Sequence, residues 1–433
     1  MDNNKLIPTN TTVALAQTSK ALAMTDKLTF NQNRKMVKEI FLSNWNFFIC
    51  HISRHYPLNN YLLRKYEKVL HWGHISCNIN LNWDDKLVSE FINEWNKLGI
   101  RMFFTFNFSD DLVEKYPELL GWNIISSRKK IWTDEFIARN IDKFDWTGLS
   151  SNQSFPWSET FLEKHQDKWN WEKLSWNKNL PWSEAFIEKY KEKWDWKELS
   201  RNNNLPWSEL FFEKYLDKWN WEKVSWNSNL PWSDAFIEKY QEKWDWKSLS
   251  ENKNLPWSEL FFEKYLDKWN WEKASWNENL PWSEAFIEKY QEKWSWKELS
   301  GNRNLPWSEL FFEKYKDKWN WEELSGNCNL PWSDSFIEKY KDKWEWGDTA
   351  FGITGLSENH NLPWSENLIE RYNEKWNWNR LFQNKSIKWS IKSLLKYKSH
   401  YGKFTFNNNI WEVIKPFIDD NLIQEVFEEY DKK

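Results

Sequence analysis

Apolar and polar positions follow one order along most of the chain, and this order returns every 25 residues. In residues 181–205, Phe186, Ile187, Tyr190 and Trp194 fall at i, i+1, i+4 and i+8, which is one face of an α-helix. Charged residues occupy the opposite face. The pattern therefore predicts that each repeat begins with an amphipathic helix.

A capping residue stands at the start of every predicted first helix. Ser183 follows the Pro-Trp pair that opens its repeat, where its hydroxyl can accept a hydrogen bond from a free backbone N–H group. Residues of this type follow the same marker in the diverged repeats too. The fourteen residues are Asn59, Asp84, Ser109, Thr133, Ser158, Ser183, Ser208, Ser233, Ser258, Ser283, Ser308, Ser333, Ser365 and Ser390. Their spacing predicts an array that spans residues 57–403.

A second, shorter helix follows within each repeat. Asp195 is placed to cap it, Trp196 and Leu199 face inward, and Ser200–Asn202 ends it. A turn then leads to Pro206, which bars further helix. Repeats of this length bury their apolar faces only against their neighbours. The sequence predicts an all-α fold, an α-solenoid of about fourteen 25-residue helix–turn–short-helix, Trp-rich repeats.

The segments outside the regular repeats differ from them in composition and in their expected roles. Residues 1–38 are rich in Asn and Thr, and we expect a mobile N-terminal segment there. Residues 39–56 and 404–433 are predicted to be N-terminal and C-terminal capping regions of the array, residues 57–403. Within the array, one interval between markers grows to 32 residues through a Gly-rich insertion at 347–355. A tolerated surface loop is the leading interpretation of the insertion, and a functional loop or hinge is the alternative.

The W-x-W-x-x-L-S-x-N pattern of residues 194–202 resembles tandem repeats in uncharacterised proteins of giant DNA viruses and some bacteria. The resemblance covers most of the chain. Those repeats often place Pro directly after the Asn, whereas this chain has Asn-x-Asn-Leu-Pro-Trp. The resemblance implies a repeat architecture and carries no activity with it.

Composition narrows the function classes. The chain has 39 Trp, and a net charge of −4 that makes nucleic acid an unlikely partner. No apolar run is long enough for a membrane span, and the N-terminus lacks the apolar core of a secretory signal. Three Cys in 433 residues argue against a disulfide framework. We expect a cytoplasmic protein that has no cofactor and no membrane contact.

One group of residues has the composition of a metal site. His71, His74 and Cys77 form an H-x-x-H-x-x-C pattern, and zinc favours nitrogen and sulfur ligands. The repeat register, however, places His71 at the helix-cap position and the other two at variable positions that are expected to be exposed. The spacing matches no strong zinc signature, so no metal site is predicted and the three residues remain a weak candidate.

The charged face of the first helix is more ordered than solubility requires. Glu184, Glu188 and Glu192 form one stripe, and Lys189 and Lys193 form another about 100° around the helix. We expect the acidic flank of one helix to meet the basic flank of the next, which mainly sets their register. Paired carboxylates also suggest a glycosidase, but they recur alike in every repeat, whereas an active site is singular. The chain is therefore predicted not to be an enzyme.

An alternation with a period of 50 residues distinguishes neighbouring repeats. Trp176, Trp226 and Trp276 occupy a slot that holds Arg, Glu or Gly in the intervening repeats, so these Trp are expected near the surface. Leu216 and Leu266 alternate in the same way with Lys and Gln. Duplication of a 50-residue block with a neutral Trp explains the pattern, and a row that faces a ligand is the alternative. These five residues are the partner-binding candidates.

The leading functional hypothesis is a non-enzymatic repeat scaffold for protein–protein interaction or self-assembly along an extended surface. The alternative is a glycan-binding or single-stranded nucleic-acid-binding module that stacks sugars or bases on exposed Trp. The near-neutral charge counts against nucleic acid, and a cytoplasmic location counts against glycans. Another protein or a second copy of the chain is therefore the expected partner.

Overall fold

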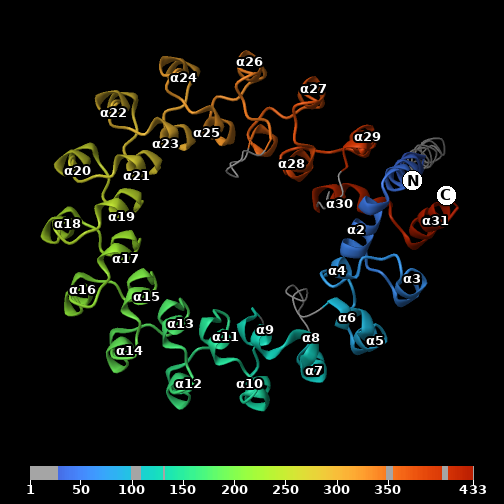
Figure 1. The fold of residues 1–433 in the computed structure, drawn as a ribbon, viewed down its shortest axis with the longest axis horizontal. Coiled ribbons are helices and arrows are strands. Elements are labelled where there is room, and N and C mark those ends of the chain that lie inside the picture. Colours follow the sequence, from blue (N-terminus) through green and yellow to red (C-terminus); the bar gives the residue numbers. More distant parts are fainter. Residues whose placement is uncertain (1–27, 99–108, 130–131, 348–354, 402–407, 433) are drawn as a thin grey trace, which may run out of the picture. The chain divides into compact units, whose positions relative to one another are not determined.

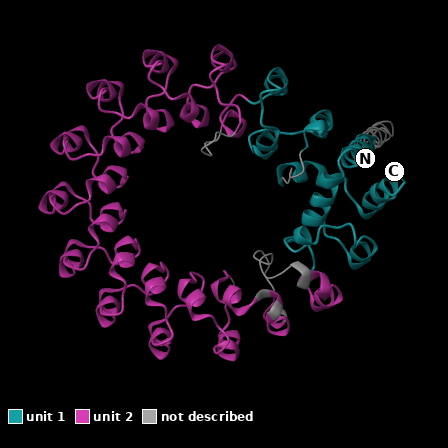
Figure 2. Ribbon diagram, viewed as in Figure 1, with its two compact units in different colours: residues 1–82, 364–433 teal, residues 83–363 magenta. Residues whose placement is uncertain are grey.

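The computed structural model divides into two compact units (Figure 2). Unit 1 combines residues 1–82 with residues 364–433, and unit 2 is formed by residues 83–363. The residues that the structure describes are 28–98, 109–129, 132–347, 355–401 and 408–432. These residues form helices and turns and contain no strand, which confirms the predicted all-α solenoid of Trp-rich repeats. None of the helices among them is long and apolar enough to cross a bilayer.

Unit 2 is a curved double layer of short helices (Figure 1). The first helices of successive repeats form its outer layer, and the second helices form its inner layer, where neighbours pack against one another. The outer helices are α5 (Asp85–Glu90), α7 (Asp110–Lys115), α10 (Asp134–Asn140), α12 (Glu159–Lys164), α14 (Glu184–Lys189), α16 (Glu209–Lys214), α18 (Asp234–Lys239), α20 (Glu259–Lys264), α22 (Glu284–Lys289), α24 (Glu309–Lys314) and α26 (Asp334–Lys339). The inner helices are α9 (Trp122–Ser127), α11 (Trp146–Ser151), α13 (Trp171–Trp176), α15 (Trp196–Arg201), α17 (Trp221–Trp226), α19 (Trp246–Glu251), α21 (Trp271–Trp276), α23 (Trp296–Gly301) and α25 (Trp321–Gly326). The first repeat also holds α6 (Ile92–Leu98), and α8 (Pro117–Leu120) precedes α9.

The predicted caps start the helices in both layers. Ser183 accepts a hydrogen bond from the backbone N–H group of Phe186, and Asp195 accepts one from that of Glu198. Thirteen of the fourteen predicted first-helix caps accept such a bond. The fourteenth, Ser109, directly precedes α7. The capping prediction is thereby confirmed for the residues whose bonds the structure gives.

Buried Ser and Asn side chains link each repeat to its neighbour. The side-chain amide of Asn227 donates to the carbonyl oxygens of Ser200 (3.1 Å) and Asn202 (3.4 Å). The Ser200 hydroxyl donates to the carbonyl oxygen of Trp196 (2.6 Å) and accepts from the backbone N–H group of Asn220 (3.0 Å). Equivalent asparagine links start at Asn177, Asn202, Asn252, Asn277, Asn302, Asn327 and Asn359. Residues expected only to end the second helix therefore connect neighbouring repeats.

Aromatic rings form the core of each repeat, as predicted for Trp194. Its indole is 5 % exposed, contacts Phe186 and lies edge-on to Trp171 of the preceding repeat, with ring centroids 5.4 and 4.8 Å away. The indole N–H group donates to the carbonyl oxygen of Ile187 (3.1 Å). Lys193 places its ammonium 5.3 Å from the centroid of the Trp171 ring, a cation–π contact between neighbouring repeats.

The acidic flank of one outer helix meets the basic flank of the next, which confirms the prediction from the charge stripes. Lys214 lies 3.1 Å from Glu188, and Lys218 lies 3.7 Å from Glu192. Since these side chains are partly exposed, each pair contributes only about 0–1 kcal/mol. Equivalent pairs are Lys189–Glu163, Lys239–Glu213, Lys264–Glu238, Lys289–Glu263, Lys314–Glu288 and Lys339–Glu313.

Unit 1 is built from both ends of the chain. Tyr66 stacks on Phe427 with 3.6 Å between ring centroids, Tyr56 donates to Asp420 (2.7 Å), and Lys38 pairs with Glu425 (2.9 Å). Its helices are residues 28–43, α2 (Trp45–His55), α3 (Asn60–Lys65), α4 (Trp72–Ile75), α27 (Glu366–Arg371), α28 (Trp378–Gln383), α29 (Ile391–Lys396), η3 (Lys398–His400), α30 (Asn408–Ile414), η4 (Lys415–Phe417) and α31 (Asp420–Tyr430). The capping roles of residues 39–56 and 404–433 stay predictions, and parts of both segments belong to this unit.

The first helix of unit 1 corrects one expected boundary. Residues 1–27 lie outside the described residues, but residues 28–38 are helical, although a mobile segment was expected as far as residue 38. Val37, Ile40 and Phe41 are completely buried, and the face that they form fixes this helix against unit 1. Arg34 adds ion pairs to two acidic residues of the C-terminal segment.

The insertion at 347–355 stands where the other repeats have an inner helix, and its residues 348–354 lie outside the described residues. The short 3-10 helix η2 (Leu356–Glu358) follows it. Beyond it, Ser357 donates its backbone N–H group to the carbonyl oxygen of Trp346 (3.1 Å). Asn359 then donates its side-chain amide to the carbonyl oxygen of Asn327 (3.2 Å). The link between repeats therefore continues across the insertion. The surface-loop and hinge interpretations stay predictions.

Candidate interaction surface

Three tryptophans on the inner layer of unit 2 are exposed. Trp176, Trp226 and Trp276 are the last residues of α13, α17 and α21, and they are 39 %, 54 % and 48 % exposed. The other tryptophans that the structure describes are buried or half-buried. The expected surface position of these three side chains, called the Trp row below, is therefore confirmed.

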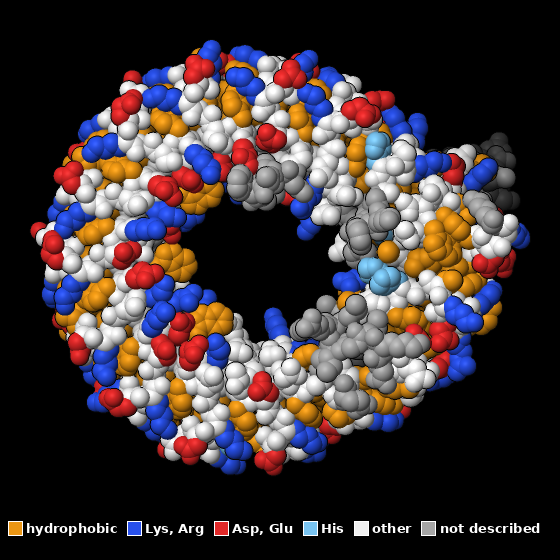
Figure 3. All heavy atoms as spheres, viewed as in Figure 1, with side chains coloured by type: hydrophobic (Ala, Val, Ile, Leu, Met, Phe, Trp, Pro, Cys, Tyr) orange, Lys and Arg blue, Asp and Glu red, His pale blue; other side chains and the backbone are white. Residues whose placement is uncertain are grey.

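The equivalent position in the repeat after each member of the Trp row holds a different residue. This residue is Arg201 after Trp176, Glu251 after Trp226, and Gly301 after Trp276. A Cβ atom at Gly301 would collide with the Trp276 ring, so the absence of a side chain there makes room for the indole. Along the inner edge of unit 2, apolar side chains alternate with side chains of both charges (Figure 3).

A cavity of about 560 Å³ opens around Trp226 on the inner layer. Its walls come from the four successive inner helices α15, α17, α19 and α21, together with the residue that caps α19. The lining residues are Arg201, Glu222, Lys223, Trp226, Asp245, Lys247, Ser248, Glu251 and Lys273. We call this the Trp226 cavity. It combines one large apolar surface with charges of both signs.

The two leucine candidates are placed differently from the Trp row. Leu216 and Leu266 are half-buried in the turns that follow the outer helices α16 and α20. They therefore do not extend the exposed apolar row of the inner layer. An apolar residue is tolerated at these positions, because part of each side chain is shielded from water.

Sequence reasoning missed a second exposed row. Leu210, Leu260 and Leu310, in α16, α20 and α24, are 80 %, 82 % and 85 % exposed. We call these the outer leucines. The signal was present, because the same 50-residue alternation places Ala185 where the next repeat has Leu210.

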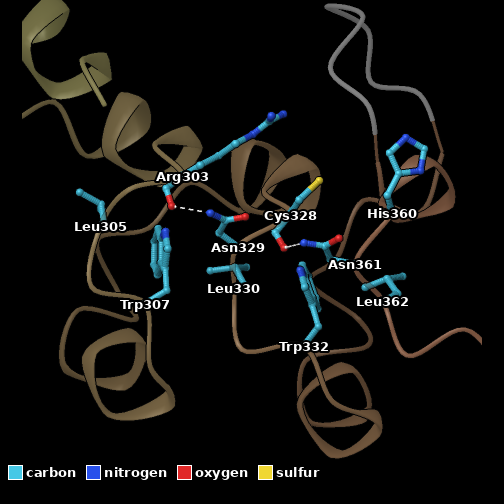
Figure 4. A pocket seen from close by; sticks show the side chains of 10 residues that line it. All are labelled: Arg303, Leu305, Trp307, Cys328, Asn329, Leu330, Trp332, His360, Asn361 and Leu362. Carbon is cyan, nitrogen blue, oxygen red and sulfur yellow. Dashed lines mark hydrogen bonds between the residues drawn. The ribbon is translucent and has the colours of Figure 1, made fainter. Parts of the chain in front are cut away.

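The turns that follow the inner helices line another cavity, of about 680 Å³ (Figure 4). Arg303, Cys328 and His360 hold one variable position in successive repeats. Asn329 donates its side-chain amide to the carbonyl oxygen of Arg303 (2.9 Å), and Asn361 donates to that of Cys328 (2.9 Å). The asparagines that recur in the lining thus form a second series of hydrogen bonds between neighbouring repeats. The cavity is the groove between the turns of successive repeats.

The weak metal candidate has a structural role in part. His71 caps α4, and its Nδ1 atom accepts from the backbone N–H group of His74 (3.2 Å). His74 and Cys77 are half-buried, rather than exposed as the register suggested. Burial, reinforced by neighbouring basic groups, lowers the pKa of His74 to about 4. Across the described parts of the chain, no three His, Cys, Asp or Glu residues are grouped to hold a metal ion.

Comparison of the whole chain with protein-family models, with curated proteins and with solved structures gave no match.

Proposed function

We propose that this chain is a non-enzymatic repeat scaffold that binds another protein, or a second copy of itself, along the inner layer of unit 2. The observation that carries the proposal is the exposure of Trp176, Trp226 and Trp276 at intervals of two repeats. Water-exposed indoles are unfavourable, and tryptophan is enriched at the centres of protein interfaces. A row on one layer of a solenoid is the form that an extended binding surface takes.

The charge distribution supports a protein partner over a nucleic acid. Charges alternate along the inner helices, with Glu222, Lys247 and Glu272 at one position of successive helices. Such a surface repels a uniformly charged backbone as much as it attracts it. The proposed location is the cytoplasm, and the three free cysteines are consistent with a reducing compartment.

Replacement of the Trp row by arginine tests the proposal. The slot already holds Arg201, so Trp176→Arg, Trp226→Arg and Trp276→Arg together should preserve the helical circular-dichroism spectrum. The matched control replaces the outer leucines with serine, which removes three exposed apolar side chains from the other layer. Self-association is measured by sedimentation velocity, and heterologous partners are measured by quantitative affinity purification from the native host.

The proposal predicts that the arginine variant loses a partner that the parent and the leucine control both retain. If the arginine variant retains every interaction of the parent, the Trp row is a relic of block duplication. Sedimentation velocity separates the two kinds of partner, because only self-association raises the sedimentation coefficient of the purified chain. Binding of a glycan or an oligonucleotide in place of a protein would also contradict the proposal.

A further inference from the structure

More basic than acidic residues line the Trp226 cavity, and most of their charges are paired. Arg201, Lys223, Lys247 and Lys273 face Glu222, Asp245 and Glu251 in its lining. Lys223 lies 2.7 Å from Glu222. Lys273 lies 2.7 Å from Glu251, an ion pair that raises the pKa of Lys273. Arg201 lies 3.5 Å from Glu198, which is outside the lining.

Lys247 is the cation that remains. This exposed side chain makes no ion pair with any residue that the structure describes, although it lines the same cavity as Trp226. Asp245, which also lines the cavity, caps α19 by accepting from the backbone N–H group of Ser248 (2.7 Å) and makes no ion pair with Lys247. An unpaired ammonium group and an exposed indole therefore line one hollow.

A single residue distinguishes Lys247 from the lysines at the same position two repeats away. Ser248 follows Lys247, whereas Glu198 follows Lys197 and Glu298 follows Lys297. Lys247 is therefore the one of these three lysines that has no acidic residue directly after it in the sequence.

We infer that the Trp226 cavity binds an acidic residue next to a large apolar residue of an extended polypeptide. The inference rests on the proposed function and specifies the chemistry of the partner. The apolar side chain packs on the exposed indole of Trp226, and the carboxylate pairs with Lys247. A nucleic acid fits less well, because its phosphates follow one another at a few ångströms. The lining does not offer an unpaired cation to each of several successive phosphates, because Arg201, Lys223 and Lys273 are already in ion pairs.

The combination of an exposed tryptophan and an unpaired lysine recurs along the inner layer. Lys197 and Lys297 follow Trp176 and Trp276 by the 21 residues that separate Lys247 from Trp226, and neither makes an ion pair within the described ranges. Packed helices lie 8–10 Å apart, so two repeats advance by about 16–20 Å, which an extended chain spans in about five or six residues. The partner segment should therefore repeat its acidic–apolar pair at about this interval. The central pair binds most strongly, because only Lys247 lacks a neighbouring glutamate.

To test the inference, a display library of random 16-residue peptides is selected for binding to the purified chain. The expected result is enrichment of peptides in which Asp or Glu adjoins a large apolar residue. Lys247→Glu should weaken the selected peptides by about tenfold or more, since a charged hydrogen bond is lost and a repulsion is added. Ser248→Glu should act in the same direction and is compatible with folding, because the repeats two positions away carry Glu198 and Glu298 there.

The control is Lys178→Glu, the same charge reversal at an exposed lysine in a turn outside the cavity. It should leave peptide affinity unchanged. Three results would overturn the inference: no enrichment, enrichment without acidic residues, or preferential binding of a 20-nucleotide single strand. If one of them occurs while the arginine variant of the Trp row still loses its native partner, the proposed function stands and only the acidic specificity fails.

Discussion

The side-chain amide of Asn227 donates a 3.1 Å hydrogen bond to the carbonyl oxygen of Ser200, which lies 27 residues earlier in the chain. Both residues are completely buried. The regular helices in both layers have only six residues, and an isolated helix of that length is unstable in water. Bonds between repeats, together with the shared aromatic core, therefore hold helices that would not persist alone.

Replacement of Asn227 by alanine should destabilise the local structure by about 1–3 kcal/mol, because the buried carbonyl oxygen of Ser200 loses its donor and that of Asn202 keeps only the indole N–H group of Trp207. Hydrogen exchange of the amides in α15 and α17 measures this free energy. The matched control is Asn229→Ala, which removes an exposed link to the carbonyl oxygen of Asn203. Water replaces that donor, so the control should cost less. Equal effects of the two changes would show that buried links are no more important than exposed ones.

The aromatic core predicts a large difference between two positions in one repeat. Trp194→Ala should cost about 3–5 kcal/mol, because a buried indole and its neighbours lose their packing. Lys191→Ala should change stability by about 0.5 kcal/mol or less, because its side chain is exposed and its ion pair with Glu188 is weak. Hydrogen exchange in α14 and α15 distinguishes the two. Similar losses would mean that the buried and exposed faces are assigned incorrectly.

Acid should weaken unit 1 through two half-buried histidines. Burial lowers the pKa of His55 and of His74 from 6.5 to about 4. Between these values the unfolded chain binds protons that the folded chain does not, so stability falls as the pH drops from about 6.5 to about 4. The loss is complete below the folded pKa.

Urea unfolding followed at several pH values between about 7 and about 4 measures this dependence. Replacement of both His55 and His74 by glutamine should flatten the slope of stability against pH, whatever it does to stability at neutral pH. An unchanged slope would show that other groups dominate acid unfolding of this unit.

Local pattern was sufficient to predict the repeat. The position of Ser183 before a face formed by Phe186 and Ile187 determines a capped helix with one buried side, and these properties need no knowledge of the neighbouring repeat. The roles of Ser200 and Asn202 were not predicted, since their partners lie in adjacent repeats. A signal was available, because Ser and Asn stay constant in the L-S-x-N pattern while the residue between them varies.

Distant packing and the details of the surface were harder to predict. No local feature near Val37 indicates that its helix packs beside a segment almost 400 residues later, because such contacts depend on the assembled fold. The exposure of Trp226 could be predicted, since its slot tolerates Arg, Glu and Gly. The exposure of Leu260 could also have been predicted, because its position alternates between Ala and Leu. The half-burial of Leu216 depends on how the chain packs after the outer helix, which sequence periodicity does not define.

The central claim is that the Trp row is the partner-binding surface, and hydroxyl-radical footprinting with mass spectrometry tests it most directly. The free chain and the complex purified from the native host are labelled in parallel, with the outer leucines as internal reference. We expect Trp176, Trp226 and Trp276 to be labelled in the free chain, because they are exposed, and to be protected in the complex. Labelling of the outer leucines should not change. Protection of the outer leucines with unchanged labelling of the three tryptophans would contradict the account.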